Sequence, residues 1–140
     1  MKNMQAVDVD ETEKWDLDEL GREIVDSIYA VHITMGVGLN ESVYKACLLE
    51  ELRSRNIKVA EEVQIQIEYK GKKIDKYYFA DLIVEGLVVL ELKAVSELLP
   101  IHEAQLMNYL RLTKLKLGYL VNFNTKLIKD GIKRRKIGYW

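Results

Sequence analysis

Two strongly apolar segments on either side of Glu85-Gly86 constrain the fold of this chain most. Residues 74–84 and 87–94 are rich in Val, Leu and Ile, and the glycine between them is typical of a tight turn. Runs of this composition predict neighbouring strands in the centre of a sheet. The remaining elements are therefore expected to flank these two strands.

The segments before and after them show helical and extended patterns. Apolar residues recur every three or four positions over 17–35, before Gly36, and again over 41–55, with Asn40 as the expected N-cap. Further elements are predicted as a strand around 63–67 with a hairpin turn at 69–72, a helix over 101–113, a strand over 117–123 and an edge strand around 132–137. The order α-α-β-β-β-α-β predicts an α/β fold, with a mixed sheet of four or five strands flanked by helices.

Size and composition predict one folded domain. The chain has 140 residues, of which 49% are hydrophobic and 31% charged, and this composition excludes disorder. We expect a flexible acidic arm over residues 1–14 and a single domain over residues 15–140. Apolar stretches such as residues 87–90 are far shorter than the ~20 residues of a membrane-spanning helix. Cys47 is the only cysteine, and no secretory signal is recognisable, so we expect a cytoplasmic location.

The net charge of -1 hides a gradient along the chain. Residues 1–26 contain nine acidic and three basic residues, whereas residues 101–140 contain nine basic and two acidic ones. The basic end includes the β-edge sequence Lys133-Arg134-Arg135-Lys136. Such a run can attract a polyanion such as nucleic acid, and a solvated surface balanced by the acidic end explains it about equally well.

Three charged residues in the central strands are the strongest sign of chemistry. Glu91 and Lys93 project from one face of their strand, because successive side chains alternate. An ion pair on a wet face explains these two residues alone. Asp81, on the preceding strand, favours a metal site, because a second carboxylate repels Glu91 unless a cation is present, and two carboxylates suit Mg²⁺.

The length of the turn decides whether Asp81 and Glu91 can meet. If Glu85-Gly86 forms a two-residue turn, Asp81 points to the face opposite Glu91. If residues 84–86 form a three-residue loop, Asp81 lies opposite Val89 and is a diagonal neighbour of Glu91 on the same face. Three-residue loops that end in glycine are common, so the metal site requires only an ordinary hairpin.

These residues resemble the D…(D/E)-x-K signature of the PD-(D/E)XK nuclease superfamily, whose restriction-endonuclease-like core has the order α-β-β-β-α-β. Residues 38–44, Gly-Leu-Asn-Glu-Ser-Val-Tyr, fit the G-x-x-E-x-x-Y string of the prokaryotic GxxExxY family within it. Residues 105–109 resemble the Q-x-x-x-Y element of RecB-like and lambda-exonuclease-like members. The resemblance covers roughly residues 22–135. Ala80 replaces the proline that the superfamily has before Asp81.

The resemblance implies a role for each matching residue. Asp81 and Glu91, together with Glu41, would hold Mg²⁺ or Mn²⁺, and Lys93 would orient the attacking water and offset developing negative charge. Gln105 would position a phosphate or the metal-bound water. From the residues alone, the preferred explanation of Glu41 is an acidic residue favoured by a helix N-terminus.

The candidates for nucleic-acid contact are more ordinary residues. Tyr44 lies one turn beyond Glu41, where packing is the favoured role, and Tyr109 shares a helix face with Gln105. The full set of candidates is Tyr44, Tyr109, Lys133, Arg134, Arg135 and Lys136. His32 and His102 are too scattered for a histidine metal site, and Cys47 is expected in the core.

We therefore expect a metal-dependent nuclease that uses Mg²⁺ or Mn²⁺ to hydrolyse phosphodiester bonds in nucleic acid, with DNA favoured over RNA. The alternative is a non-catalytic nucleic-acid-binding or accessory module that keeps the fold, acting as a homodimer or in a larger complex. The intact set of Asp81, Glu91 and Lys93 favours the enzyme. No membrane partner is expected.

Overall fold

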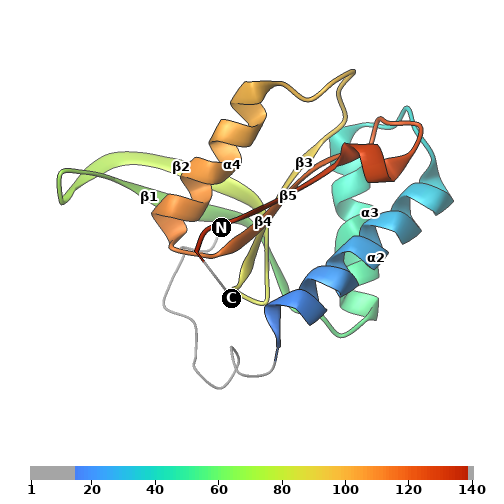
Figure 1. Ribbon diagram of the computed structural model, residues 1–140, viewed down its shortest axis with the longest axis horizontal. Coiled ribbons are helices and arrows are strands. Elements are labelled where there is room, and N and C mark those ends of the chain that lie inside the picture. Colours follow the sequence, from blue (N-terminus) through green and yellow to red (C-terminus); the bar gives the residue numbers. More distant parts are fainter. Residues whose placement is uncertain (1–14, 139–140) are drawn as a thin grey trace.

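A five-stranded mixed sheet organises the chain, in the order β1-β2-β3-β4-β5 (Figure 1). The computed structural model describes residues 15–138, so the predicted arm over 1–14 lies outside the described residues. Strands β3 and β4 are parallel, and the other neighbours are antiparallel. The strands are β1 Val59–Tyr69, β2 Lys72–Val84, β3 Val88–Lys93, β4 Leu117–Asn122 and β5 Ile132–Lys136. The predicted α/β class and mixed sheet are confirmed.

Helices cover both faces of this sheet. The two N-terminal helices lie on one face and α4 on the other (Figure 1). The helices are α2 Leu17–Met35, α3 Glu41–Ser54, α4 Pro100–Thr113 and the short 3₁₀ helix η1 Ile128–Gly131. The predicted helical spans differ from these by no more than one residue. None of the helices within residues 15–138 combines the length and apolar character needed to cross a bilayer.

Each face of the sheet has its own apolar core. The larger core packs α2 and α3 against alternate residues of β2, β3 and β4, including Leu82, Leu90 and Val121. The smaller core packs Leu106 and Leu110 of α4 against the opposite face. The central strand β3 is buried on both faces, as its apolar composition predicts.

Tyr44 fixes how α3 starts relative to α2. Its hydroxyl donates to Gly36 O at 2.6 Å and accepts from the Leu39 N–H at 3.3 Å, while its ring stacks on Phe123 at 4.6 Å between centroids. Gly36 ends α2 with a φ of 71°, a conformation that glycine adopts without strain. The glycine-rich connection is thus fastened to the core just before Glu41, the first residue of α3.

The turn between β2 and β3 differs from both predicted registers. Glu85 and Gly86 have φ angles of 52° and 67°, and the Leu87 N–H donates to Val84 O at 2.9 Å. Val84 nevertheless pairs with Val88, so Leu87 is an extra residue in the loop. The loop has three residues, as the metal site requires, but it comprises residues 85–87 instead of 84–86.

The hairpin of β1 and β2 continues far beyond its contact with β3. Only residues 82–84 of β2 pair with β3, whereas β1 and β2 pair with each other out to Tyr69 and Lys72. The outer part of this hairpin projects from the rest of the molecule in Figure 1. We refer to residues 66–78 as the hairpin arm.

Candidate active site

Asp81 and Glu91 lie side by side where β2 leaves β3. The register pairs Leu82 with Leu90, and its continuation by one residue sets Asp81 opposite Glu91. The Asp81 backbone N–H donates to Glu91 Oε1 at 3.3 Å, and Asp81 Oδ2 accepts from the Leu92 N–H at 2.8 Å. These side-chain hydrogen bonds thus replace the backbone hydrogen bonds of a regular β-ladder. The two residues are direct cross-strand neighbours, whereas the sequence analysis predicted a diagonal arrangement.

Ordinary alternation along β2 and β3 gives Asp81 this position. Ile83 and Val89 pair with each other and face the smaller core, on the α4 side of the sheet. Asp81 is two residues from Ile83 and Glu91 is two residues from Val89, so both side chains project from that face. The alternation breaks only beyond Asp81, where Ala80 packs in the same core as Ile83.

Glu91 is held in an environment that disfavours a negative charge. Its side chain is buried, with 5% of its surface exposed. Burial, followed by the neighbouring Asp81 carboxylate, raises the pKa of Glu91 from 4.5 to about 9. Lys93 opposes this rise without reversing it. Without a further cation the pair holds a proton at neutral pH, and this is the electrostatic condition in which a divalent cation can replace that proton.

Lys93 and Glu41 lie close to this pair. Lys93 is two residues beyond Glu91 on β3 and so projects from the same face. Partial burial, and then the charge of Asp81, raises the pKa of Glu41, while Lys93 lowers it. The start of α3 therefore brings a third carboxylate within electrostatic reach of Asp81 and Lys93.

Gln105 and Tyr109 approach from α4. Gln105 Nε2 donates to Tyr109 Oη at 3.1 Å, one helical turn away. Burial, and then the charges of Glu91 and Asp81, raises the pKa of Tyr109 to about 12. Tyr109 is only 4% exposed, so little of its side chain is open to the predicted nucleic-acid contact. It packs beside the carboxylates, and Gln105 is the more accessible member of the pair.

The carboxylates fit a divalent cation in their chemistry. Asp81 and Glu91 offer oxygen ligands on adjacent strands, which hard cations such as Mg²⁺ prefer. Among residues 15–138, no three acidic, histidine or cysteine side chains are gathered as a ready metal centre. Of the three predicted ligands, Asp81 and Glu91 are in contact, and Glu41 interacts electrostatically with Asp81.

Two other expectations about single residues are resolved by burial and hydrogen bonds. Tyr44 has the packing role favoured for it, since its side chain is completely buried between Gly36 and Phe123 and leaves no surface for the predicted nucleic-acid contact. The histidines have structural partners: His32 Nε2 lies 2.8 Å from Thr125 O, and His102 Nδ1 accepts from the Leu99 N–H at the start of α4 at 3.0 Å.

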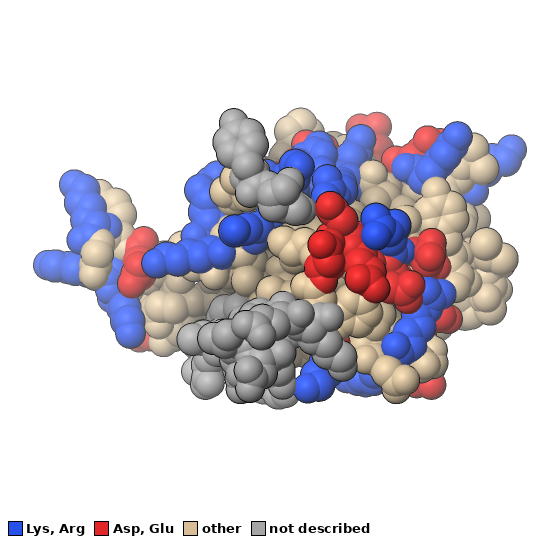
Figure 2. Space-filling model, turned by 60° about the horizontal axis from the view of Figure 1, so that its bottom comes forward, with Lys and Arg blue, Asp and Glu red and all other residues tan. Residues whose placement is uncertain are grey.

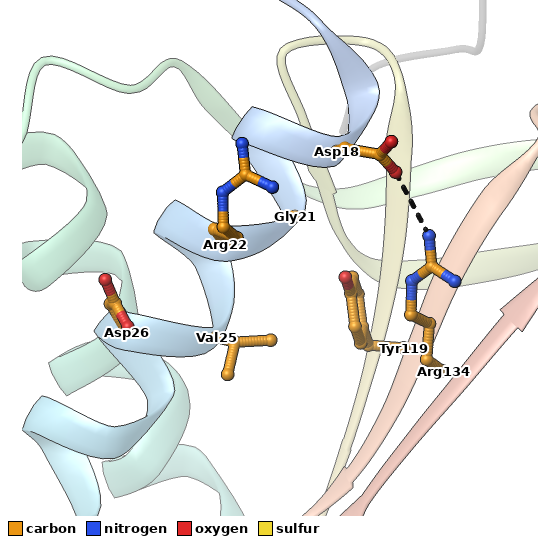
Figure 3. A pocket seen from close by; sticks show the side chains of 7 residues that line it. All are labelled: Asp18, Gly21, Arg22, Val25, Asp26, Tyr119 and Arg134. Carbon is orange, nitrogen blue, oxygen red and sulfur yellow. Dashed lines mark hydrogen bonds and ion pairs between the residues drawn. The ribbon is translucent and has the colours of Figure 1, made fainter. Parts of the chain in front are cut away.

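The basic run of β5, Lys133 to Lys136, does not form one patch. Arg134 Nη2 lies 3.4 Å from Asp18 Oδ1 of α2, in a pocket that Tyr119 and Gly21 also line (Figure 3). Arg135 Nη2 lies 2.9 Å from Glu103 Oε2 of α4, on the other face of the sheet. Strand alternation thus divides the run between two faces, which the sequence pattern predicts once β5 is recognised as a strand.

Sequence reasoning missed two supports of the site. Asn122, 1% exposed, accepts from the Val95 N–H at 3.0 Å and donates to Val95 O at 2.9 Å, and so fixes the chain just after Lys93. Lys45 and Glu62 form a hydrogen-bonded ion pair between α3 and β1, near Glu41. A polar residue at the end of an apolar strand was the available signal for Asn122; nothing in the sequence indicated the Lys45–Glu62 pair.

Comparison with known families agrees with this arrangement. Residues 18–135 match the PD-(D/E)XK nuclease superfamily, and the chain belongs to this superfamily. Its mixed sheet flanked by helices is the restriction-endonuclease-like fold of that class. Superfamily membership points to nuclease activity that depends on a divalent metal. No curated protein and no solved structure matches the chain significantly.

Proposed function

We propose that this protein is a metal-dependent nuclease that hydrolyses phosphodiester bonds, with DNA favoured over RNA. The observation that carries the proposal is the direct contact of Asp81 with Glu91 on adjacent strands, with Lys93 on the same face as Glu91. Burial of Glu91 beside a second carboxylate is unfavourable for stability and is typical of a site built for a cation.

Each residue has a role that follows from its position. Asp81 and Glu91 would hold Mg²⁺ or Mn²⁺, which when bound polarises a phosphodiester and lowers the pKa of water. Lys93 orients the attacking water and offsets negative charge on the phosphate oxygens. Glu41 completes the acidic side of the site, directly or through water. Gln105, held by Tyr109, hydrogen-bonds the phosphate.

We further propose that the chain belongs to the GxxExxY family, near the RecB-like branch. Glu41 and Tyr44 of the G-x-x-E-x-x-Y string support this, since Tyr44 anchors the connection from which α3 presents Glu41 to the site. We also propose that residues 15–140 form a single domain. The proposed location is the cytoplasm, and the protein is proposed to act as a homodimer or within a larger complex.

A substrate panel tests the proposed activity. Purified protein is incubated with single- and double-stranded DNA and RNA in Mg²⁺, in Mn²⁺ and in EDTA. We expect cleavage of DNA with either metal and none in EDTA. Salt-dependent binding without cleavage of any substrate would instead favour the non-catalytic binding module.

A further inference from the structure

The hairpin arm is the most exposed part of the fold. Beyond Ala80, the β2 residues toward Lys72 pair only with β1, so both outer edges of this two-stranded ribbon face solvent. A two-stranded ribbon of this kind gains little stability by itself. The length and projection of the ribbon therefore indicate a function other than packing in the core.

Basic side chains are concentrated at the end of the arm. Residues 69–78 contain four lysines and one acidic residue, in a chain whose net charge is -1. Figure 2 shows Lys and Arg side chains gathered at this end, at the left of the molecule. The lysines are Lys70, Lys72, Lys73 and Lys76; all are exposed, and none forms an ion pair with another described residue.

Aromatic side chains accompany these lysines. Tyr69 is 63% exposed, Tyr77 41% and Tyr78 42%. Large aromatic groups that stay in water on a projecting ribbon mark a binding surface. Lysines interleaved with exposed aromatic rings fit single-stranded nucleic acid, because the ammonium groups contact phosphates and the rings stack on unpaired bases.

The arm leads directly to the candidate active site. The ring of Tyr78, at the inner end of the arm, lies 5.4 Å from the ring of Tyr109 between centroids. The charges of Glu91 and Asp81 act on Tyr109 in turn. Tyr78 is also only three residues before Asp81 on β2, so the inner end of the arm adjoins the candidate active site.

We propose that the hairpin arm binds a single-stranded segment of the nucleic acid and guides it to Asp81 and Glu91. The lysines contact phosphates, and Tyr69 and Tyr78, which the strand register places on one face of the ribbon, stack on bases. The guiding role rests on the proposed nuclease function, whereas the binding role does not. A protein partner would also suit exposed tyrosines, but four exposed lysines against one acidic residue within ten positions favour a polyanion.

Binding measured in EDTA separates the arm from the catalytic site. Fluorescence anisotropy with a labelled single-stranded DNA oligonucleotide, titrated over a range of salt, compares three proteins. They are the wild type, a variant with Lys70, Lys72, Lys73 and Lys76 changed to Gln, and a matched control with Lys114, Lys116, Lys126 and Lys129 changed to Gln. The control makes the same charge change at exposed lysines elsewhere. Circular dichroism checks that all three are folded, and cleavage with Mn²⁺ is measured in parallel.

The arm variant is expected to lose much of its salt dependence. Each phosphate contact contributes roughly 0.7 to the log-log slope for a single strand, so four contacts contribute about 3. The control should keep the wild-type slope. A Tyr69→Ser/Tyr78→Ser variant should keep the slope but bind single-stranded DNA roughly tenfold more weakly or worse, with a smaller loss for duplex DNA.

The outcomes separate the two proposals. If the arm variant binds with the wild-type slope, the arm proposal is wrong and the nuclease proposal stands on its cleavage data. If the arm variant loses binding but the wild type cleaves nothing, the arm binds nucleic acid and the nuclease proposal fails. If the wild type binds no nucleic acid at low salt, both the arm proposal and the nuclease proposal fail. In that case, self-association of the wild type that the arm variant loses would assign the arm to a protein contact.

Discussion

Glu91 is the residue of the site whose surroundings most disfavour a negative charge. It is buried, it touches Asp81, and its pKa is raised to about 9. Without a cation, folding therefore keeps a proton on a carboxyl group that would lose it in the unfolded chain above pH 4.5. Rising pH consequently favours unfolding of the metal-free protein between about pH 4.5 and 9.

Replacement of Glu91 by Gln should remove this pH dependence. Gln keeps the shape of the protonated carboxyl, so Glu91→Gln is expected to be more stable than wild type at pH 8 in EDTA. For the wild type, Glu91 lowers the free energy of unfolding by at most about 1.4 kcal/mol per pH unit in this window. Urea denaturation from pH 5 to pH 9 measures the effect, with Glu97→Gln as an exposed control. Equal slopes for wild type and Glu91→Gln would show that Glu91 is already ionised.

Lys93 allows metal binding to be separated from catalysis. Lys93→Ala leaves both carboxylates in place, so Mg²⁺ affinity measured by calorimetry should be unchanged or higher, since a nearby positive charge is removed. Cleavage should fall ~10²- to 10³-fold, as for loss of one preorganised charge at a developing oxyanion. Cleavage at the wild-type rate would mean that Lys93 is not part of the catalytic group.

Among the elements, α4 is placed by its close approach to β4 at Gly118. A Cβ atom at this position would lie 2.9 Å from Leu106 Cδ1, 3.2 Å from Leu110 Cδ2 and 3.2 Å from Val89 O. The absence of a side chain thus lets α4 settle against the sheet, and α4 carries Gln105 to the site. The glycine is a packing requirement, since its φ is not in the left-handed region.

Gly118→Ala should push α4 away from the sheet. We expect a loss of about 1 to 3 kcal/mol in the free energy of unfolding, typical of overpacking in a core, and weaker cleavage. Adding Leu106→Ala should cost less in the Gly118→Ala background than in the wild type, because it removes one of the clashing groups. Urea denaturation of the wild type, the two single variants and the double variant completes this double-mutant cycle. Additive losses in the free energy of unfolding would contradict a direct clash.

The sequence predicted elements better than their registers. The periodicity of α2, α3 and α4 defines their ends within about a residue, because amphipathic helices bury one face against the sheet. The β2–β3 register depended on whether Leu87 joined the turn, and local sequence did not decide that. Asp81 lies opposite Glu91 because of this extra residue, which leaves no distinctive sequence pattern.

At the scale of the whole molecule, within residues 15–138, part of the basic C-terminal end is paired with acidic side chains of the helices. The basic β5 contacts acidic residues of α2 and α4, through Arg134 with Asp18 and Arg135 with Glu103. The hairpin arm, from the middle of the chain, is the basic feature that projects from the fold (Figure 2). Sequence reasoning favoured the run at residues 133–136 because contiguity in sequence is visible, whereas exposure is not.

Replacement of Lys133, Arg134, Arg135 and Lys136 by Ala should therefore flatten the salt dependence of DNA binding only slightly. Two of these residues already pair with carboxylates, and alternation sends neighbours to opposite faces of the sheet. We expect the log-log slope to change by less than about 2, against about 3 for the arm variant. Anisotropy titrations under the same conditions compare the β5 variant with the arm variant. A larger change of slope in the β5 variant than in the arm variant would show that β5 is the main binding surface.

The central claim is that Asp81 and Glu91 form the metal-dependent catalytic centre of a nuclease. The most direct test is the rate of DNA cleavage by the wild type and by Asp81→Asn, each with Mn²⁺ and with EDTA. The wild type should cleave only with metal, and Asp81→Asn, which keeps the shape of the side chain but removes a ligand charge, should be slower by at least ~10²-fold. Cleavage by Asp81→Asn at the wild-type rate would contradict the claim.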